Sequence, residues 1–145
     1  MKRKMPYSQA EKLVLEYASP AARLDIGRHS AHLLAELEAL IRADIAPISR
    51  IILCATLVDS LRYEATSFDE ETDDGFDEGY AWLNRAEREA LGWLRARRNA
   101  LVHVDSADEL SLALSDYDDD SQLQTDASRA LKALLPLLEE REIIR

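Results

Sequence analysis

Hydrophobic residues recur at spacings of three and four along most of the chain, which is the pattern of amphipathic helices. A short first helix is predicted by Leu13, Val14 and Tyr17. Ser19 followed by Pro20 reads as a helix cap with proline at the first helical position, so a longer helix is expected from there to about residue 44. Its apolar stripe is Leu24, Leu33, Leu34, Leu37, Leu40 and Ile41.

Three more helices are predicted downstream. Pro47 separates a third helix, about 48–67, from the second. The helical pattern resumes near Gly79 and runs to about residue 105, with a break expected at Gly92. A last helix spans about 126–142, and Pro136 inside it should produce a kink. We find neither an internal repeat nor a strand-like alternation, so the pattern predicts an all-α bundle of four to five helices.

Two acidic segments interrupt these helices. Segment 68–78 carries seven acidic residues and no basic one, and segment 116–120 carries four aspartates. Neither has the ligand spacing of a calcium loop. We interpret both as solvated loops, with weak adventitious metal binding as the alternative, because dense like charges resist compaction.

Composition narrows the class of protein. The 145 residues fit one domain, 1–145, and four Gly and four Pro are too few for a turn-dense β fold. The only cysteine, Cys54, lies in an apolar run and reads as a core residue, which excludes a disulfide framework. No window approaches the length of a membrane span, and the basic N-terminus lacks the apolar stretch of a signal peptide. We therefore expect a soluble, cytoplasmic protein.

One charged residue occupies an apolar position. On a helical wheel, Arg98 falls in the middle of the stripe formed by Leu91, Leu94, Leu101 and Val102. A guanidinium stays charged, so Arg98 must be paired, or must face a substrate or a second subunit. Two structural alternatives remain open: the side chain reaches water at the bundle edge, or it forms a buried ion pair.

The third helix offers a partner for Arg98. It carries one apolar stripe of Leu53, Leu57, Val58 and Leu61, and a second of Ile52, Thr56, Asp59 and Tyr63. The helix therefore reads as buried on two sides, where an unpaired carboxylate would be costly. Asp59 is the predicted partner, and Glu64, near the first stripe, is the second choice.

Two polar residues accompany Arg98 on its helix. Asn99 and His103 are four residues apart, so they share a face on which the amide could orient the imidazole for proton transfer. One helix does not fully bring Arg98 and His103 together, whereas a second copy of the helix would. His29 and His32 have no evident third ligand and read as surface residues, with a metal pair as the alternative.

The sequence from Arg98 to His103, RNALVH, resembles the signature of the HEPN superfamily, the higher eukaryotes and prokaryotes nucleotide-binding domains. Its motif is Arg, four to six residues, then His, often with Asn after the Arg, on a late helix of a four- or five-helix bundle. The resemblance implies a two-fold homodimer whose two motifs line one cleft, with Asp59 as the acid of an earlier helix. Many members resemble metal-independent endoribonucleases that act as toxins or in phage defence. Asp105 stands where one toxin branch carries Tyr, which departs from that branch.

The resemblance also implies a chemistry that needs no metal or cofactor. The substrate would be RNA. His103 would act as general acid or base, Arg98 would stabilise the phosphate, and Asn99 would orient the histidine or a phosphate oxygen. Arg95 and Arg97 are candidate substrate-binding residues on the same helix. An antitoxin protein is a further candidate partner.

The net charge of −10 is unfavourable for a nucleic-acid binder, since phosphate contacts dominate such affinity. Residues 85–103, however, carry five arginines and two glutamates, a local charge of +3. Three hypotheses therefore stand: an HEPN-type ribonuclease, a non-catalytic HEPN-like module that binds nucleotide, RNA or protein, and a helical dimer in which Arg98 is structural.

Overall fold

The chain folds into a helical bundle in the computed structural model, which describes residues 7–18, 24–66, 82–102 and 120–143. The helices are α1 (Gln9–Ala18), α2 (Arg28–Ala43), α3 (Pro47–Thr66), α5 (Arg85–Val102) and α7 (Asp120–Glu140). Within these ranges the only β-type pairing is an isolated antiparallel bridge between Leu24 and Glu142. The prediction of an all-α bundle is therefore confirmed for the described residues.

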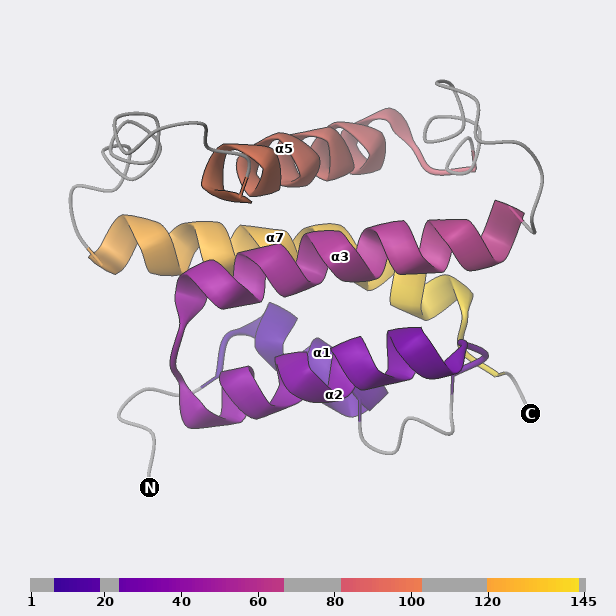
Figure 1. Cartoon of the computed structure of the whole chain (residues 1–145), viewed down its shortest axis with the longest axis horizontal. Coiled ribbons are helices and arrows are strands. Elements are labelled where there is room, and N and C mark those ends of the chain that lie inside the picture. The colour runs from indigo at the N-terminus through magenta and orange to yellow at the C-terminus, as the bar shows by residue number, and fades with distance from the viewer. Residues whose placement is uncertain (1–6, 19–23, 67–81, 103–119, 144–145) are drawn as a thin grey trace.

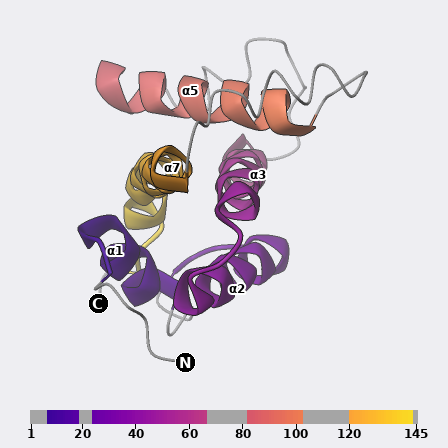
Figure 2. The same ribbon diagram turned by 90° about the vertical axis from the view of Figure 1, so that its left-hand side faces the viewer.

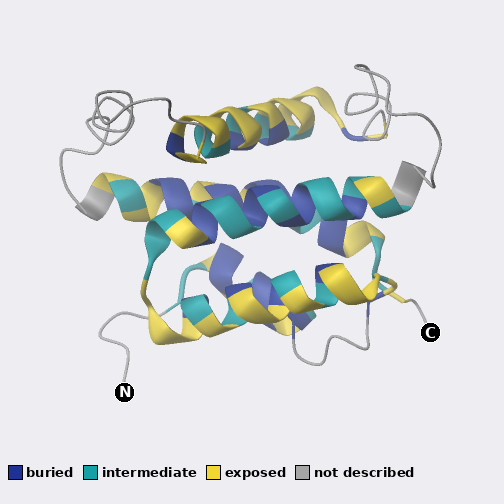
Figure 3. Ribbon diagram, viewed as in Figure 1, coloured by how far each residue is buried: buried dark blue, intermediate teal, exposed yellow. Residues whose placement is uncertain are grey.

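The helices form three layers. Helices α3 and α7 lie side by side in the middle, α5 covers one side of them, and α1 and α2 cover the other (Figures 1 and 2). Helix α3 contacts α2, α5 and α7, so it is the central element of the bundle. Figure 3 shows the buried residues on the helix sides that face the interior. The largest apolar side chains there include Leu34, Leu37, Ile41, Ile51, Leu57, Leu61, Leu91, Leu94, Leu131, Leu134 and Leu138.

Local sequence signals account for several helix ends. Pro47 occupies the first position of α3, where its missing N–H costs nothing. At α1, the Ser8 hydroxyl accepts from the Glu11 N–H at 3.2 Å while the Glu11 carboxylate accepts from the Ser8 N–H at 2.8 Å. Asn84 and Glu87 form the same reciprocal pair at the start of α5.

The predicted start of the second helix is wrong. Residues 24–27 are not helical, and α2 begins at Arg28 with Gly27 as its cap. The Asp25 N–H donates to the Arg141 carbonyl at 2.8 Å and the Gly27 N–H donates to the Glu64 carboxylate, so this segment is hydrogen-bonded to the C-terminal end of the chain and to α3 instead of forming a helix. The proposed cap at Ser19 and Pro20 lies outside the described residues.

Two other helix boundaries differ from the prediction. Helix α5 runs through Gly92 without a break, because Leu91 and Leu94 on either side are buried against the bundle. It begins at Arg85 rather than near residue 79, since Asn84 caps it. Helix α7 begins at Asp120 instead of residue 126 and continues past Pro136. Segments 67–81 and 103–119 lie outside the described residues, with all of the acidic stretch 68–78 and all of 116–120 except Asp120.

No helix in the described ranges has the length and apolar character needed to cross a membrane.

Candidate functional site

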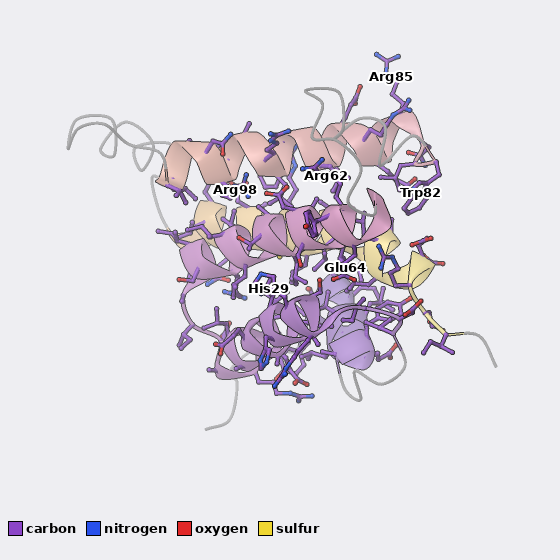
Figure 4. All side chains as sticks on the ribbon, turned by 45° about the vertical axis from the view of Figure 1, so that its right-hand side comes forward. His29, Arg62, Glu64, Trp82, Arg85 and Arg98 are labelled. Carbon is purple, nitrogen blue, oxygen red and sulfur yellow. The ribbon has the colours of Figure 1, made fainter. Side chains whose placement is uncertain are left out.

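The site centres on an ion pair between α5 and α3. The two helices run antiparallel (Figure 1), and Arg98 Nη1 donates to Asp59 Oδ2, which confirms the partner predicted for Arg98. The Arg98 side chain is 18% exposed and that of Asp59 is 35% exposed. The pair therefore lies at the rim of the α3–α5 contact, within reach of water, rather than in the core. Figure 4 shows Arg98 at the underside of α5, next to α3.

Apolar side chains close the space beside this pair. It is lined by Ala55, Val58, Leu91 and Leu94, together with Arg95, and leaves no room for a water molecule. The Arg98 Nε is buried and has no hydrogen-bond partner. Any anion that binds the guanidinium must therefore approach from the exposed side of the pair, where it competes with the Asp59 carboxylate.

The second stripe of α3 is less buried than predicted. Tyr63 is 58% exposed, and Ile52, Thr56 and Asp59 are half-buried. The Thr56 hydroxyl donates a hydrogen bond to the Ile52 carbonyl of its own helix at 2.8 Å. The interior side of α3 packs on α2 and α7, so this stripe is left at the surface next to Arg98. Helix α3 is thus buried on its core-facing sides but has a partly apolar open face.

The other predicted site residues lie at different depths on α5. Arg95 and Asn99 are exposed, and Arg97 is half-buried. His103 follows the last described residue of α5 and lies outside the described residues. The approach of Asn99 to the His103 imidazole therefore stays a prediction.

Glu64, the second choice for pairing with Arg98, has other partners. Its carboxylate accepts from the Gly27 N–H at 2.8 Å and from the Ser30 hydroxyl, and Arg141 lies 3.4 Å away. The reason is geometric: Glu64 lies five residues beyond Asp59, about 140° around the helix, and so faces α2. Figure 4 places it on that side of α3.

A buried arginine was missed by the sequence analysis. Arg50, 2% exposed, pairs with Glu11 of α1 at 3.5 Å and donates to Gln124 Oε1 of α7 at 2.9 Å. It precedes Cys54 and Leu57 by four and seven residues, so it lies on an apolar stripe of α3 and met the criterion applied to Arg98. Because it joins three helices inside the core, we interpret this cluster as structural.

The remaining titratable candidates are arranged as the sequence predicted. Cys54 is buried, and this burial raises the pKa of its thiol to about 12, against the opposing effect of the Arg50 charge. His29 and His32 are both exposed, which confirms them as surface residues. No group of three or more His, Cys, Asp or Glu side chains in the described ranges is arranged to hold a metal ion.

Comparison with protein-family models gave no match, and no significant match was found among curated proteins or solved structures. Functional inference therefore depends on the residues and geometry described above.

Proposed function

We propose that this protein is an HEPN-type, metal-independent endoribonuclease that acts as a toxin or phage-defence component. The observation that carries the proposal is Arg98: the arginine of the RNALVH sequence is on α5 and is ion-paired with an acid of an earlier helix, Asp59. That is the arrangement which the resemblance implies.

In this proposal the reaction is an internal transesterification of RNA. The 2′-oxygen forms a bond to the adjacent phosphorus, the bond to the 5′-oxygen breaks, and a cyclic phosphate and a free 5′-hydroxyl result. His103 takes the proton of the 2′-hydroxyl or supplies one to the leaving oxygen. Arg98 stabilises the charge that develops on the phosphate, and Asn99 orients the imidazole or a phosphate oxygen. Asp59 is a positioning residue that holds the guanidinium.

The proposed active form is a two-fold homodimer. A second motif helix would supply the convergence of Arg98 and His103 that one helix lacks. Tyr63 and Val102 are exposed near the Arg98 pair and provide apolar surface for such a contact. An antitoxin protein is proposed as a further partner.

A second candidate function is favoured by the closed packing around Arg98. With its guanidinium paired to Asp59 and apolar side chains packed against one side of the pair, the arginine could serve to join α5 to α3. Under that hypothesis the bundle is a structural helical dimer, whereas a non-catalytic binding module would keep its fold in variants of Arg98 and His103 and lose a ligand. In the structural dimer, replacing Arg98 would weaken the fold, while replacing His103 would do little.

The first test is growth after induced expression in a bacterial host, with the wild type compared with His103→Ala at matched soluble levels. His32→Ala, which removes an exposed histidine of α2, is the control. The proposal expects arrest by the wild type and the control but not by His103→Ala. Purified protein should then cleave RNA in the presence of EDTA. Equal arrest by all three proteins would remove His103 from the mechanism and contradict the site assignment.

A further inference from the structure

Arg98 and Asp59 are each held by a single partner. Within the part of the chain that the structure describes, the contact between Arg98 Nη1 and Asp59 Oδ2 is the only polar contact that either side chain makes. A guanidinium has five N–H donors, and the Nε of Arg98 is buried without an acceptor. A buried donor without a partner costs free energy, so this contact leaves the guanidinium poorly satisfied.

Among the described residues, two other ion pairs join segments that are far apart in the chain, and both are held at more than one point. Arg50 of α3 pairs with Glu11 of α1 and also donates to Gln124 of α7. The Glu64 carboxylate contacts Arg141 and accepts hydrogen bonds from two further donors. Losing one contact in either cluster leaves another in place. The pair between α5 and α3, in contrast, is released when one contact breaks.

An anion from solvent and the Asp59 carboxylate compete for the same guanidinium. The space on the inner side of the pair is lined mainly by apolar side chains and leaves no room for a water molecule. On the outer side, Asp59 is the more exposed of the two side chains. An arriving anion is therefore repelled by the carboxylate and gains Arg98 only when the carboxylate moves away. A phosphate group can accept two parallel N–H bonds from a guanidinium, one more than Asp59 accepts here.

We propose that Asp59 is an intramolecular competitor of the substrate. Its carboxylate occupies Arg98 in the free protein and must be displaced by a phosphodiester group of RNA before the arginine can act. The inference rests on the proposed function, since it says how that site is kept closed until RNA binds. Asp59 thus holds the guanidinium at the rim of the α3–α5 contact and at the same time lowers the affinity for RNA, because only the fraction of molecules with the pair open can bind.

The test measures RNA binding after the charge of the competitor is removed. A fluorescently labelled single-stranded RNA oligonucleotide is titrated with full-length protein in a His103→Ala background that prevents cleavage. Asp59→Asn keeps an oxygen to which Arg98 can donate but removes the carboxylate charge. It should tighten RNA binding by about tenfold, the difference between a charge-assisted and a neutral hydrogen bond. Glu89→Gln, which neutralises an exposed carboxylate paired with Arg85 on α5, should change the affinity by less than about twofold.

A second comparison shows whether the gain acts through Arg98. Arg98→Gln removes the guanidinium, and in this background Asp59→Asn should no longer tighten RNA binding. The double variant leaves no charge at the rim of the α3–α5 contact, and circular dichroism checks that it is folded. If Asp59→Asn tightens binding equally with and without Arg98, or no more than Glu89→Gln does, the carboxylate acts only through the general charge of the protein and the inference is overturned.

The outcomes also separate this inference from the proposed function. If the wild type cleaves RNA but Asp59→Asn binds it with unchanged or lower affinity, Asp59 only positions the guanidinium, so the competition is wrong and the ribonuclease proposal stands. If Asp59→Asn binds RNA more tightly but the wild type does not cleave it, the competition is supported at a site that binds RNA without cutting it. If the wild type and all variants neither bind nor cleave RNA, both proposals fail together.

Discussion

Arg50 and Arg98 are both ion-paired to a carboxylate, but water reaches them to different extents. The Arg50 and Glu11 side chains are 2% and 8% exposed, against 18% and 35% for Arg98 and Asp59. The cost of removing one partner rises with the burial of the charge that is left behind. The two pairs should therefore respond differently to the same substitution.

We expect Glu11→Ala to lower the free energy of unfolding by about 3–5 kcal/mol, because it leaves the Arg50 charge buried. Asp59→Ala should cost only about 1–2 kcal/mol, since water can solvate Arg98 in its place. Urea unfolding at pH 7 measures both, with Glu38→Ala in an exposed pair on α2 as the reference for a cost below about 1 kcal/mol. Equal costs for Glu11→Ala and Asp59→Ala would mean that the rim position of Arg98 has no energetic effect.

Cys54 provides a pH-dependent test of burial. Its thiol has a pKa of about 12 in the folded chain and about 8.5 when unfolded, so above pH 9 the unfolded state has released a proton that the folded state retains. Stability attributable to this group is therefore complete below about pH 8.5 and falls as the pH rises toward 12. The free energy of unfolding should fall with a slope that approaches about 1.4 kcal/mol per pH unit, the value for a difference of one bound proton between the folded and unfolded states. Unfolding measured from pH 8 to 10.5 should show a shallower decline in Cys54→Ala, and an identical decline would contradict the burial of the thiol.

Sequence patterns within a helix predicted the helix boundaries that short-range interactions determine. The third helix was expected at about 48–67 and is found at Pro47–Thr66, because a proline start and a long apolar pattern are both local. The start of α2 was mispredicted because Leu24 and Asp25 pair with the C-terminal end of the chain. No short-range pattern contains that contact.

The ion pairs of the candidate site and its surroundings also differ in whether the sequence pattern of single helices could predict them. The Arg98–Asp59 pair could be predicted because each residue interrupts an apolar stripe on its own helix. The pairing of Arg50 with Glu11 needed one more fact, the face that α1 turns toward α3. Likewise Glu64 could be assigned to Arg141 only once the chain end was placed against α3.

Helix α5 yields a stability prediction at Gly92. Among the described residues, the methyl group of alanine at this position meets no atom within 4 Å, and alanine reduces the conformational entropy of the unfolded chain. We expect Gly92→Ala to raise the free energy of unfolding by about 0.5–1 kcal/mol in urea titrations. Ala96→Gly, four residues away on the same exposed face, should lower it by a similar amount. A loss of stability in Gly92→Ala would show that the helix does not accept a side chain at this position.

At the scale of the whole molecule, one side chain joins the end of the chain to two distant segments. Arg141 donates to the Leu61 carbonyl at 2.9 Å and to the Asp25 carbonyl at 3.2 Å, and it lies 3.4 Å from the Glu64 carboxylate. Its side chain is mostly buried. The carbonyl of Arg141 also accepts from the Asp25 N–H. Arg141 therefore contacts the segment before α2 and the end of α3 together, beside the Glu64–Gly27 hydrogen bond and the Leu24–Glu142 bridge.

Arg141→Ala should lower the free energy of unfolding by about 2–4 kcal/mol, because two carbonyls and a carboxylate lose a charged donor while remaining largely shielded from water. The stability of Arg141→Lys should fall between those of the wild type and Arg141→Ala, since an ammonium group cannot reproduce the forked hydrogen bonds of the guanidinium. Arg42→Ala, an exposed pair on α2, should cost less than about 1 kcal/mol. Hydrogen exchange gives a local readout. The Asp25 amide should exchange faster in Arg141→Ala, whereas the exchange rates of the α5 amides should change only as far as the global stability changes. If Arg141→Ala and Arg42→Ala cost the same and the Asp25 amide keeps its protection, the segment before α2 is held by its backbone pairing and by the Gly27–Glu64 hydrogen bond without the Arg141 side chain.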